Sequence, residues 1–335
     1  MQRSYIILAY KLPEQMARMI LRLSDGDQTF FYIHVDKTFD ITPFQHACKD
    51  IPNVFFLTGN SRVHSYWGDY GTVQATLNAM KRIVEDGRRG MIILLSGQDY
   101  PIRSNAEINA FLEAHSDCDF SLHFELPSST RWVHTNGGMN RLRHYRVSLH
   151  RPGRALQSVE IRPLDFSLSN LKQCILLMLF RPLLAFRAVQ FLLTPRKIPV
   201  CLNYYGGETW WAMRVTSAAA ILNFLADHPE VPAFFRYVDI PEEILFASLL
   251  KTLPETGQTV QNSPLRLICW DQTDSSSPLL LTMKHKEKIQ AARKKKDLLF
   301  ARKFDQSQES ALLDWLDEKL LQPAGGELNL NREKV

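Results

Sequence analysis

The chain has 335 residues, of which 45% are hydrophobic and 22% charged, and its net charge is +5. This composition excludes an intrinsically disordered protein, because the apolar residues suffice for a full core. The five cysteines are widely spaced and form no CxxC pair, which argues against a disulfide framework or a zinc site and favours reduced thiols.

The apolar segments also bear on where the protein resides. Residues 4–10 form too short an apolar run for a signal peptide, and no uninterrupted apolar run reaches transmembrane length. We therefore expect a cytoplasmic protein, and we leave open whether it also binds peripherally to the inner face of the membrane.

Predicted strands and helices alternate through the first part of the chain. Apolar runs predict strands at 5–10, 30–35, 54–57, 91–95 and 120–124, and helical spacing predicts helices at 13–23, 70–84 and 105–114. This alternation is typical of an α/β fold with a doubly wound, mostly parallel sheet and helices on both faces.

The strand at 91–95 is the most apolar of the set, and polar residues follow it directly. Gln98, Asp99 and Tyr100 stand at its carboxyl end, the edge at which open α/β sheets bind ligands. Asp99 is thus a candidate for ligand contact. The alternative is that Asp99 only caps the helix beginning near Ser104 or closes the turn.

An Arg-rich insert at about 150–200 interrupts the pattern. Within it, residues 168–193 form long apolar runs that Pro182 divides into two short helices, with Lys172, Arg181 and Arg187 within one half of the helical wheel. Two interpretations stay open. The segment is either a hydrophobic cover packed on the sheet or an interfacial helix pair whose basic residues face lipid headgroups.

The last part of the chain contains a further strand at 204–213, a helix at 217–226 and a helix that begins at Pro241. Glu242 and Glu243 lie in the first turn of that helix, where acids can simply complement the helix dipole. Residues 264–270 predict one more strand, and 281–305 are strongly basic. We predict a single domain at 1–305 and a C-terminal helix with a polar tail at 306–335.

Six segments resemble, in order, those of the core 2/I-branching β-1,6-N-acetylglucosaminyltransferase and peptide O-xylosyltransferase family, glycosyltransferase family 14, as a bacterial-type member. They are 32–37 (YIHVDK), 95–102 (LSGQDYPI), 206–211 (GGETWW), 241–248 (PEEILFAS), 266–270 (RLICW) and 300–305 (FARKFD). The resemblance implies a GT-A-type nucleotide-sugar-binding fold and an inverting, metal-independent transfer from a UDP-sugar, with no cofactor. The acceptor would be a hydroxyl of a glycan, glycolipid or peptide.

The resemblance also implies roles for single residues. Glu243 matches the general base of the family, with Glu242 beside it. Asp36 matches the position that reads the uracil edge, and Arg302 and Lys303 suit the departing diphosphate. On the acceptor side we place Trp270, Glu208, Trp210 and Asp99. N-acetylglucosamine is the favoured sugar and xylose the alternative.

Two Asp-x-Asp pairs, at 25–27 and 117–119, test the metal question. Both precede predicted strands, at the edge opposite the expected ligand crevice, so both suit helix-to-strand turns better than a metal site. The basic run at 293–296 has no zinc finger or aromatic-interleaved strand beside it, which argues against nucleic acid and favours a solvated or lipid-facing role.

The sequence departs from the family in three respects. Neither the disulfide framework nor the N-terminal anchor of the animal branching enzymes is visible, and no match to an additional arginine is found near 279–281. Glu208 stands where many relatives have a small residue. The alternative function is a catalytically silent nucleotide-sugar- or glycan-binding module of the same fold.

Overall fold

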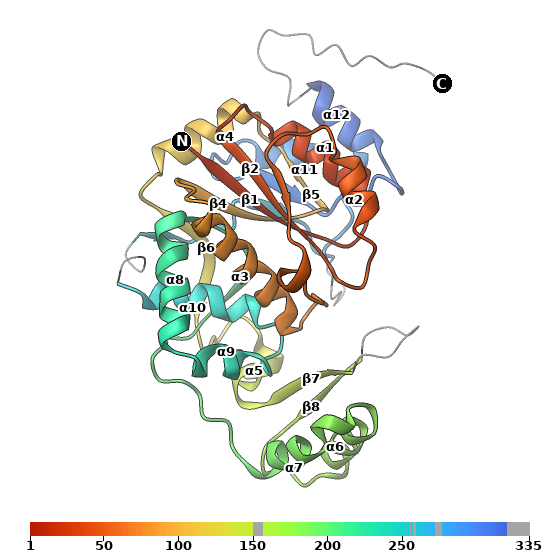
Figure 1. Cartoon of the computed structure of the whole chain (residues 1–335), viewed down its shortest axis with the longest axis vertical. Coiled ribbons are helices and arrows are strands. Elements are labelled where there is room, and N and C mark those ends of the chain that lie inside the picture. The colour runs from red at the N-terminus through yellow and green to blue at the C-terminus, as the bar shows by residue number, and fades with distance from the viewer. Residues whose placement is uncertain (150–156, 255, 257–258, 272–276, 320–335) are drawn as a thin grey trace.

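The computed structural model describes residues 1–149, 157–254, 256, 259–271 and 277–319. A seven-stranded sheet forms its centre (Figure 1). Its strands are, in spatial order, β10 (Val260–Gln261), β6 (Asp119–Glu125), β9 (Tyr205–Arg214), β4 (Met91–Ser96), β1 (Arg3–Ala9), β2 (Thr29–Val35) and β3 (Val54–Phe56). Neighbouring strands are parallel except where β9 pairs with β4 and β6. The predicted mostly parallel α/β sheet is confirmed.

Helices cover both faces of this sheet, as predicted. Along β1, Tyr5 and Ile7 point into one core and Ile6 into the other. The first core is covered by α1 (Pro13–Leu23), α2 (Thr42–Ala47), α4 (Asn105–Ala114), α11 (Lys286–Ala292) and α12 (Ala311–Lys319). The second is covered by α3 (Tyr70–Glu85), α8 (Val215–Asp227), α9 (Glu230–Phe235) and α10 (Glu242–Thr252). Both faces are hidden, so the central strands are apolar on both sides.

Helix α4 begins at the predicted residue for a local reason. The Ser104 hydroxyl accepts a hydrogen bond from the Glu107 amide at 3.3 Å, and the Glu107 carboxylate accepts one from the Ser104 amide at 2.8 Å. This reciprocal capping box satisfies two amides at the helix start. Ser104 therefore caps the helix, and the alternative interpretation of Asp99 as its cap is wrong.

A second, three-stranded sheet lies beside the carboxyl end of β4. It consists of β11 (Arg266–Ile268), β12 (Phe300–Arg302) and β5 (Asp99–Pro101), in that order. The sequence predicted a strand only at 264–270 and placed it without a partner. Strands of three residues leave little periodic signal, so β5 and β12 were missed.

The insert contains more structure than the sequence predicted. After α5 (Met139–Arg143) comes an antiparallel hairpin of β7 (Tyr145–Leu149) and β8 (Gln157–Ile161), followed by α6 (Leu168–Phe180) and α7 (Ala185–Leu193). A 3-10 turn, η3 (Pro182–Leu184), separates the two helices at the predicted proline. Further 3-10 turns lie at η1 (Gly59–Ser61), η2 (Val133–Thr135) and η4 (Met283–His285).

The insert has a small core of its own, separate from the two cores of the main sheet. That core consists of Val147, Leu149, Val159, Ile161, Cys174, Leu177, Ala188 and Phe191. Helices α6 and α7 thus pack on the hairpin, and the insert projects from the main body (Figure 1). The interpretation of this segment as a cover on the main sheet is wrong. Among the described residues, no helix is long and apolar enough to cross a membrane. The predicted tail beyond residue 319 lies outside the described residues.

Helix α10 begins with a buried acid. Glu242 is 2% exposed, and within the described part of the chain its Oε2 has no hydrogen-bond partner. Burial raises the pKa of Glu242 from its ordinary value of 4.5 to about 8. Glu242 is therefore protonated in the folded protein at neutral pH, whereas it is ionised in the unfolded chain.

This difference predicts a pH-dependent stability. Between about pH 4.5 and 8 the unfolded chain binds fewer protons, so the contribution of Glu242 is full below pH 4.5 and is lost as the pH rises through 8. Glu242→Gln removes this titration. We expect the difference in free energy of unfolding between parent and variant to change by about 1.4 kcal/mol per pH unit in this interval. Urea unfolding from pH 4.5 to 8.5 measures it, and parallel pH profiles would contradict the assignment.

Candidate active site

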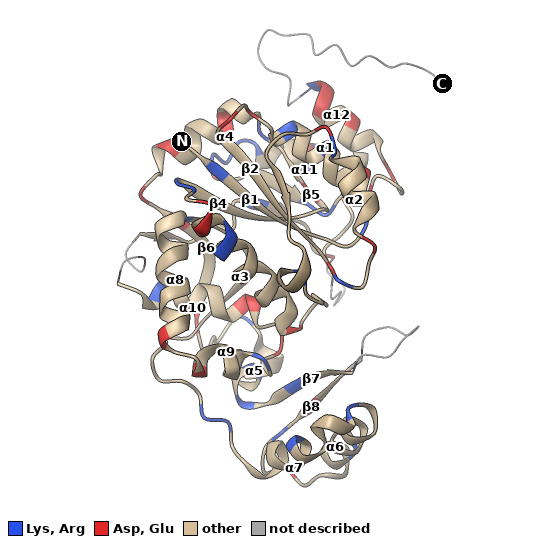
Figure 2. Ribbon diagram, in the orientation of Figure 1, with Lys and Arg blue, Asp and Glu red and all other residues tan. Residues whose placement is uncertain are grey.

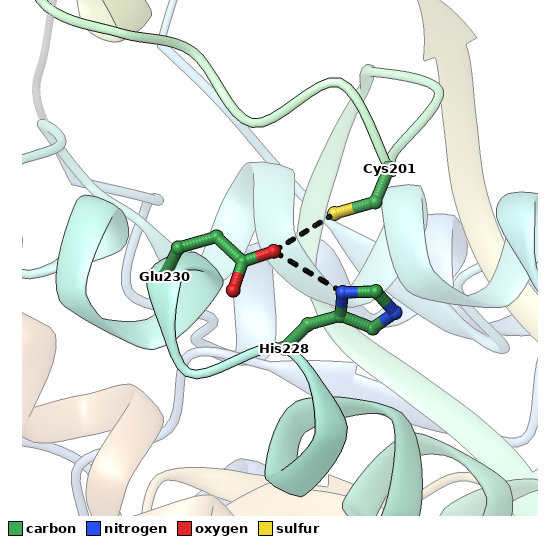
Figure 3. Close-up of side chains that lie close together, drawn as sticks. All are labelled: Cys201, His228 and Glu230. Carbon is green, nitrogen blue, oxygen red and sulfur yellow. Dashed lines mark hydrogen bonds and ion pairs between the residues drawn. The ribbon is translucent and has the colours of Figure 1, made fainter.

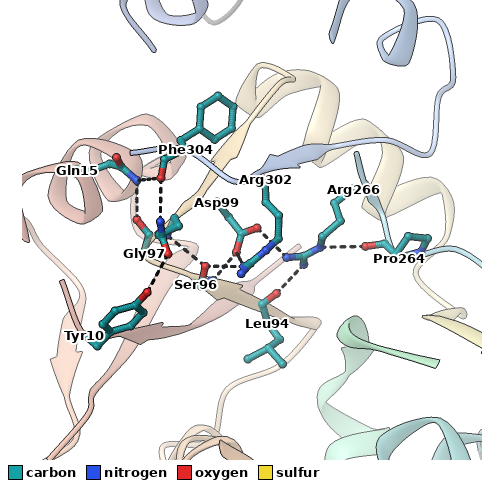
Figure 4. A network of polar contacts seen from close by, with 11 residues as sticks. Tyr10, Gln15, Leu94, Ser96, Gly97, Asp99, Pro264, Arg266, Arg302 and Phe304 are labelled. Carbon is teal, nitrogen blue, oxygen red and sulfur yellow. Dashed lines mark hydrogen bonds and ion pairs between the residues drawn. The ribbon is translucent and has the colours of Figure 1, made fainter. Parts of the chain in front are cut away.

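The candidate site lies where the parallel strands β1, β2 and β4 end, as expected for an open α/β sheet. Its centre is Asp99, which is fully buried in β5. One carboxylate oxygen accepts a hydrogen bond from Arg266 Nη1 at 3.0 Å, and the other lies 3.5 Å from Arg302 Nη1 (Figure 4). The register of the small sheet explains the second contact, because Asp99 and Arg302 are direct cross-strand partners. Asp99 therefore holds two arginines together.

The two guanidinium groups also share an aromatic ring. Arg302 and Arg266 lie 4.3 and 4.5 Å from the centre of the Trp210 ring, and Arg266 donates to the Leu94 carbonyl at 2.7 Å. Burial lowers the pKa of Arg266 to about 10, so it keeps its charge at neutral pH. Because its side chain is buried, Arg266 holds Asp99 and the small sheet in place rather than contacting a ligand. Arg302 is partly exposed and can meet a ligand.

Lys303 and Lys11 add positive charge beside Arg302. Lys303 Nζ donates to the Ser277 hydroxyl at 3.1 Å, and Lys11 Nζ pairs with Asp305 at 2.7 Å. Partial burial, and then the charges of Arg302 and Lys11, lower the pKa of Lys303. A lowered pKa means that the local field disfavours further positive charge, and an anion such as a diphosphate would relieve it.

Glu243 differs from its neighbour Glu242 in exposure and in partners. Its side chain is 23% exposed, and its Oε2 accepts a hydrogen bond from Arg141 Nη1 at 2.7 Å. Arg141 in turn stacks 3.8 Å from the centre of the Trp132 ring, which fixes the guanidinium. Burial raises the pKa of Glu243, Arg141 lowers it by a smaller amount, and the charge of Glu208 raises it further. A carboxylate with a raised pKa is a stronger base than a solvated one.

The charge of Glu208 acts on Glu243, and the charges of three arginines act on Glu208. Burial raises its pKa, and the charges of Arg266, Arg131 and Arg302 oppose this rise. Within the described part of the chain, its Oε2 is buried without a hydrogen-bond partner.

The glycine before Glu208 has a packing role. A Cβ on Gly207 would stand 2.2 Å from the Leu122 carbonyl oxygen, so glycine is needed for β9 to run this close to β6. Gly207 thereby places Glu208 in the site.

Asp36 stands at the carboxyl end of β2 and is 3% exposed. One carboxylate oxygen accepts from the Thr38 amide at 2.7 Å, and the other accepts from the amide and hydroxyl of Ser65. These hydrogen bonds lower the pKa of Asp36 against the effect of burial, so it is ionised at neutral pH. Its contact with a uracil stays a prediction, and its carboxylate also orders the loop at Ser65.

The structure places the remaining predicted acceptor residues in unlike environments. Trp270 is 54% exposed, whereas Trp210 is 9% exposed and lies against the two arginines. Asp99 is fully buried and faces those same arginines. For Asp99 and Trp210 the contacts found are therefore internal. Their direct contact with an acceptor stays a prediction.

The sequence interpretation gave no role to three charged residues that the fold brings into the site: Arg141, Arg266 and Lys11. Arg266 lies in one of the six family-like segments, so that segment was a signal for it. Arg141 lies before the Arg-rich insert, in a segment for which the sequence predicted no helix or strand. Lys11 follows β1 directly, at the ligand edge, and its position in the chain could have identified it.

Both Asp-x-Asp pairs lie where the sequence placed them. Asp25 lies between α1 and β2 and pairs with Arg3, and Asp119 is the buried first residue of β6, where it pairs with Arg214. Both pairs are thus at the amino ends of strands, opposite the site.

Another group of metal-ligand types, Cys201, His228 and Glu230, was not predicted as a cluster (Figure 3). Glu230 Oε1 lies 3.8 Å from Cys201 Sγ and 3.1 Å from His228 Nδ1, and these two contacts account for the grouping.

Comparison with known proteins shows one family match and several similar sequences. The family model described as Core-2/I-Branching enzyme matches residues 4–154. Xylosyltransferase 2 of Mus musculus is 22% identical over 279 residues, which are 80% of this chain and 26% of that protein. Xylosyltransferase 1 of Homo sapiens is 23% identical over 273 residues, 80% of this chain and 24% of that protein. The chain thus spans about a quarter of the length of these relatives.

Solved structures overlap this chain only weakly. A protein named as a glucose-1-phosphate thymidylyltransferase from Bacillus anthracis has a TM-score of 0.29 and 13% identity over 65% of this chain and 74% of its own. UDP-glucose pyrophosphorylase from Leishmania major has a TM-score of 0.28 and 9% identity over 68% and 52%. Residues 4–154 thus match the Core-2/I-branching enzyme family, and most of the chain is similar in sequence to xylosyltransferases.

Proposed function

We propose that this protein is an inverting glycosyltransferase that moves a sugar from a UDP-sugar to an acceptor hydroxyl without a divalent metal. The observation that carries the proposal is one arrangement of charge. Glu243 is partly exposed and paired with Arg141, and the charge of Glu208 raises its pKa. The charges of Arg266 and Arg302, at the carboxyl ends of the strands, in turn lower the pKa of Glu208. A base and fixed cations in one site suit a displacement with an anionic leaving group.

In the proposed step, Glu243 accepts the proton of the acceptor hydroxyl as its oxygen attacks the anomeric carbon. The bond between that carbon and the diphosphate oxygen breaks, and its electron pair leaves with UDP. Arg302 and Lys303 lie at the edge where this negative charge would develop, and Asp99 holds Arg302 in place. The exposed ring of Trp270 offers an apolar surface for a sugar.

We also propose the identity of the sugar donor and the class of acceptor. The sequence resemblance favours UDP-N-acetylglucosamine, whereas the relatives that match are named xylosyltransferases. Both UDP-sugars therefore belong in the first test. For the acceptor we propose a glycan, glycolipid or peptide hydroxyl.

The test is UDP release from a panel of UDP-sugars, with the parent, Glu243→Gln and Glu242→Gln compared. We expect release from one donor by the parent. Glu243→Gln should keep UDP binding, measured by calorimetry, and lose about 100-fold or more in rate, because the amide keeps the shape but not the basicity. Glu242→Gln, which alters a buried protonated group, should stay active. A silent binding module would bind UDP but release no UDP from any UDP-sugar. An inactive Glu242→Gln together with an active Glu243→Gln would show that Glu243 is not the base.

Arg141 provides a second prediction, on the pH dependence of the rate. Glu243 must be ionised to act as a base, so the rate falls as the pH drops through its pKa. The charge of Arg141 lowers this pKa. Arg141→Gln should therefore shift the acid limb of the kcat profile to higher pH. Arg143→Gln, which changes the same charge on an exposed residue of the same helix, is the control. An unshifted acid limb in Arg141→Gln would argue against Glu243 as the base.

Metal independence is supported by the cations at the site and by the position of both Asp-x-Asp pairs at the opposite edge. We expect the rate to be unchanged by a chelator such as EDTA. A rate that collapses in chelator and returns with manganese would overturn this part of the proposal. Cys201→Ser should behave like the parent in this assay, since the cluster at Glu230 has no part in the proposed step.

A further inference from the structure

The insert presents an apolar surface to solvent. Helices α6 and α7 and the segments beside them contribute its side chains, and Leu168, Leu183 and Phe186 are 88%, 98% and 84% exposed. We call this surface the outer face of the insert. Its members are Leu164, Phe166, Leu168, Ile175, Leu179, Phe180, Leu183, Phe186, Val189 and Leu193. So many exposed large apolar side chains within one small unit indicate an interaction site.

The insert does not need these exposed apolar side chains for its own folding. On α6 only a narrow stripe with Cys174 and Leu177 packs on the hairpin, while Leu168, Ile175 and Leu179 recur at helical spacing on the exposed side. On α7, Ala188 and Phe191 face inward, and Phe186 faces outward. The helices therefore carry more apolar surface than their own small core uses.

The charge around the outer face is of one sign. Residues 161–200 contain six Lys or Arg and a single acid, Asp165, which Arg162 pairs at 3.0 Å. Lys172, Arg181 and Arg187 are exposed. Lys172 lies on the same stripe of α6 as Leu168 and Ile175, whereas Arg181 also donates to the Ser148 carbonyl and Arg187 to the Tyr237 hydroxyl. In Figure 2 the ribbon of α6, α7 and the following segment is marked with blue and almost no red. Apolar side chains mixed with cations are the pattern of a helix that lies in the headgroup region of a bilayer.

We propose that the outer face of the insert docks on the surface of an anionic lipid bilayer. The helices rest on the surface rather than cross it, because the 13 residues of α6 span about 20 Å, less than the apolar thickness of a bilayer. A second copy of this chain is a poorer occupant. In a two-fold dimer the same basic patch would face itself, with no acid available to neutralise it. This inference goes beyond the proposed reaction and does not rest on it.

Polar contacts join the insert to the main body, so docking would orient the whole protein. Arg146 of the hairpin pairs with Asp239 at 2.9 Å, and Arg196 donates to the carbonyls of His144 and Tyr237 at 2.7 and 3.1 Å. Asp239 stands shortly before Glu243 in the chain. A bilayer held by the outer face would thus lie in a fixed relation to the candidate site.

Vesicle flotation of the full chain tests the proposal. Vesicles of phosphatidylcholine alone are compared with vesicles that also contain phosphatidylglycerol, at low and at high salt. We expect flotation with anionic vesicles at low salt and its loss with neutral vesicles or high salt. Each cation near an anionic leaflet strengthens binding about five-fold. The triple variant Lys172→Gln/Arg181→Gln/Arg187→Gln should therefore bind about 100-fold more weakly. Leu183→Ser/Phe186→Ser should bind at least about ten-fold more weakly.

Two matched controls locate the binding surface. The basic run after α11 lies at the other end of the molecule (Figure 1), so Lys294→Gln/Lys295→Gln/Lys296→Gln changes the same charge elsewhere. Leu21→Ser removes an exposed leucine from α1. Both controls should float like the parent. No flotation of the folded parent would overturn the proposal. Flotation that is lost only in the triple-lysine control would overturn it too. So would a dimer of the parent, measured by light scattering without vesicles, that Leu183→Ser/Phe186→Ser dissociates.

Discussion

The buried ion pair between Asp99 and Arg266 is the interaction on which the candidate site depends. Both side chains are excluded from water, at a separation of 3.0 Å. Removing one partner of such a pair typically costs about 3 to 5 kcal/mol, because the other charge stays buried without compensation. The pair joins β5 to β11 within the small sheet, Arg266 also donates to the Leu94 carbonyl of β4, and the same carboxylate reaches Arg302. It therefore joins three segments that are far apart in sequence, and it sets a positive field at the ligand edge.

Three glutamates occupy different environments around this field, although two of them are adjacent in sequence. Glu242 is buried and kept protonated, whereas Glu243 is partly exposed and paired with Arg141. Glu208 raises the pKa of Glu243, and the arginines oppose the rise of its own pKa. The raised pKa of Glu243 suits proton abstraction, and the arginine pair suits an anionic leaving group. We infer that the site separates these two tasks in space, as a displacement at one carbon requires.

Much of the main sheet could be predicted from the sequence, because its elements carry strong local signals. The strand at 91–95 is apolar on both faces, and Ser104 with Glu107 forms a capping box that marks the start of α4. The short strands β5 and β12 form only through their partners, and the β7–β8 hairpin lies in a segment without clear alternation. The contacts of Asp99 follow from that pairing, so the sequence identified the residue but not its partners.

The site shows the same division. Glu243, Arg302 and Lys303 could be selected from family-like segments. Arg141 could not be selected, because its role arises from the stacking on Trp132 and from a contact across 102 positions of the chain. The insert was ambiguous in sequence, since an apolar helix with a few cations fits either a cover or an interface. Only the separate core at the hairpin shows which face is left exposed.

The central claim is that a single base and fixed cations perform one displacement. The anomeric configuration of the product tests it most directly. With an α-linked UDP-sugar and its acceptor, proton NMR of the freshly formed product should show a β-linkage, because attack occurs opposite the leaving diphosphate. An α-linked product would require two displacements or a different geometry of attack, and it would contradict this account of Glu243 and the arginine pair.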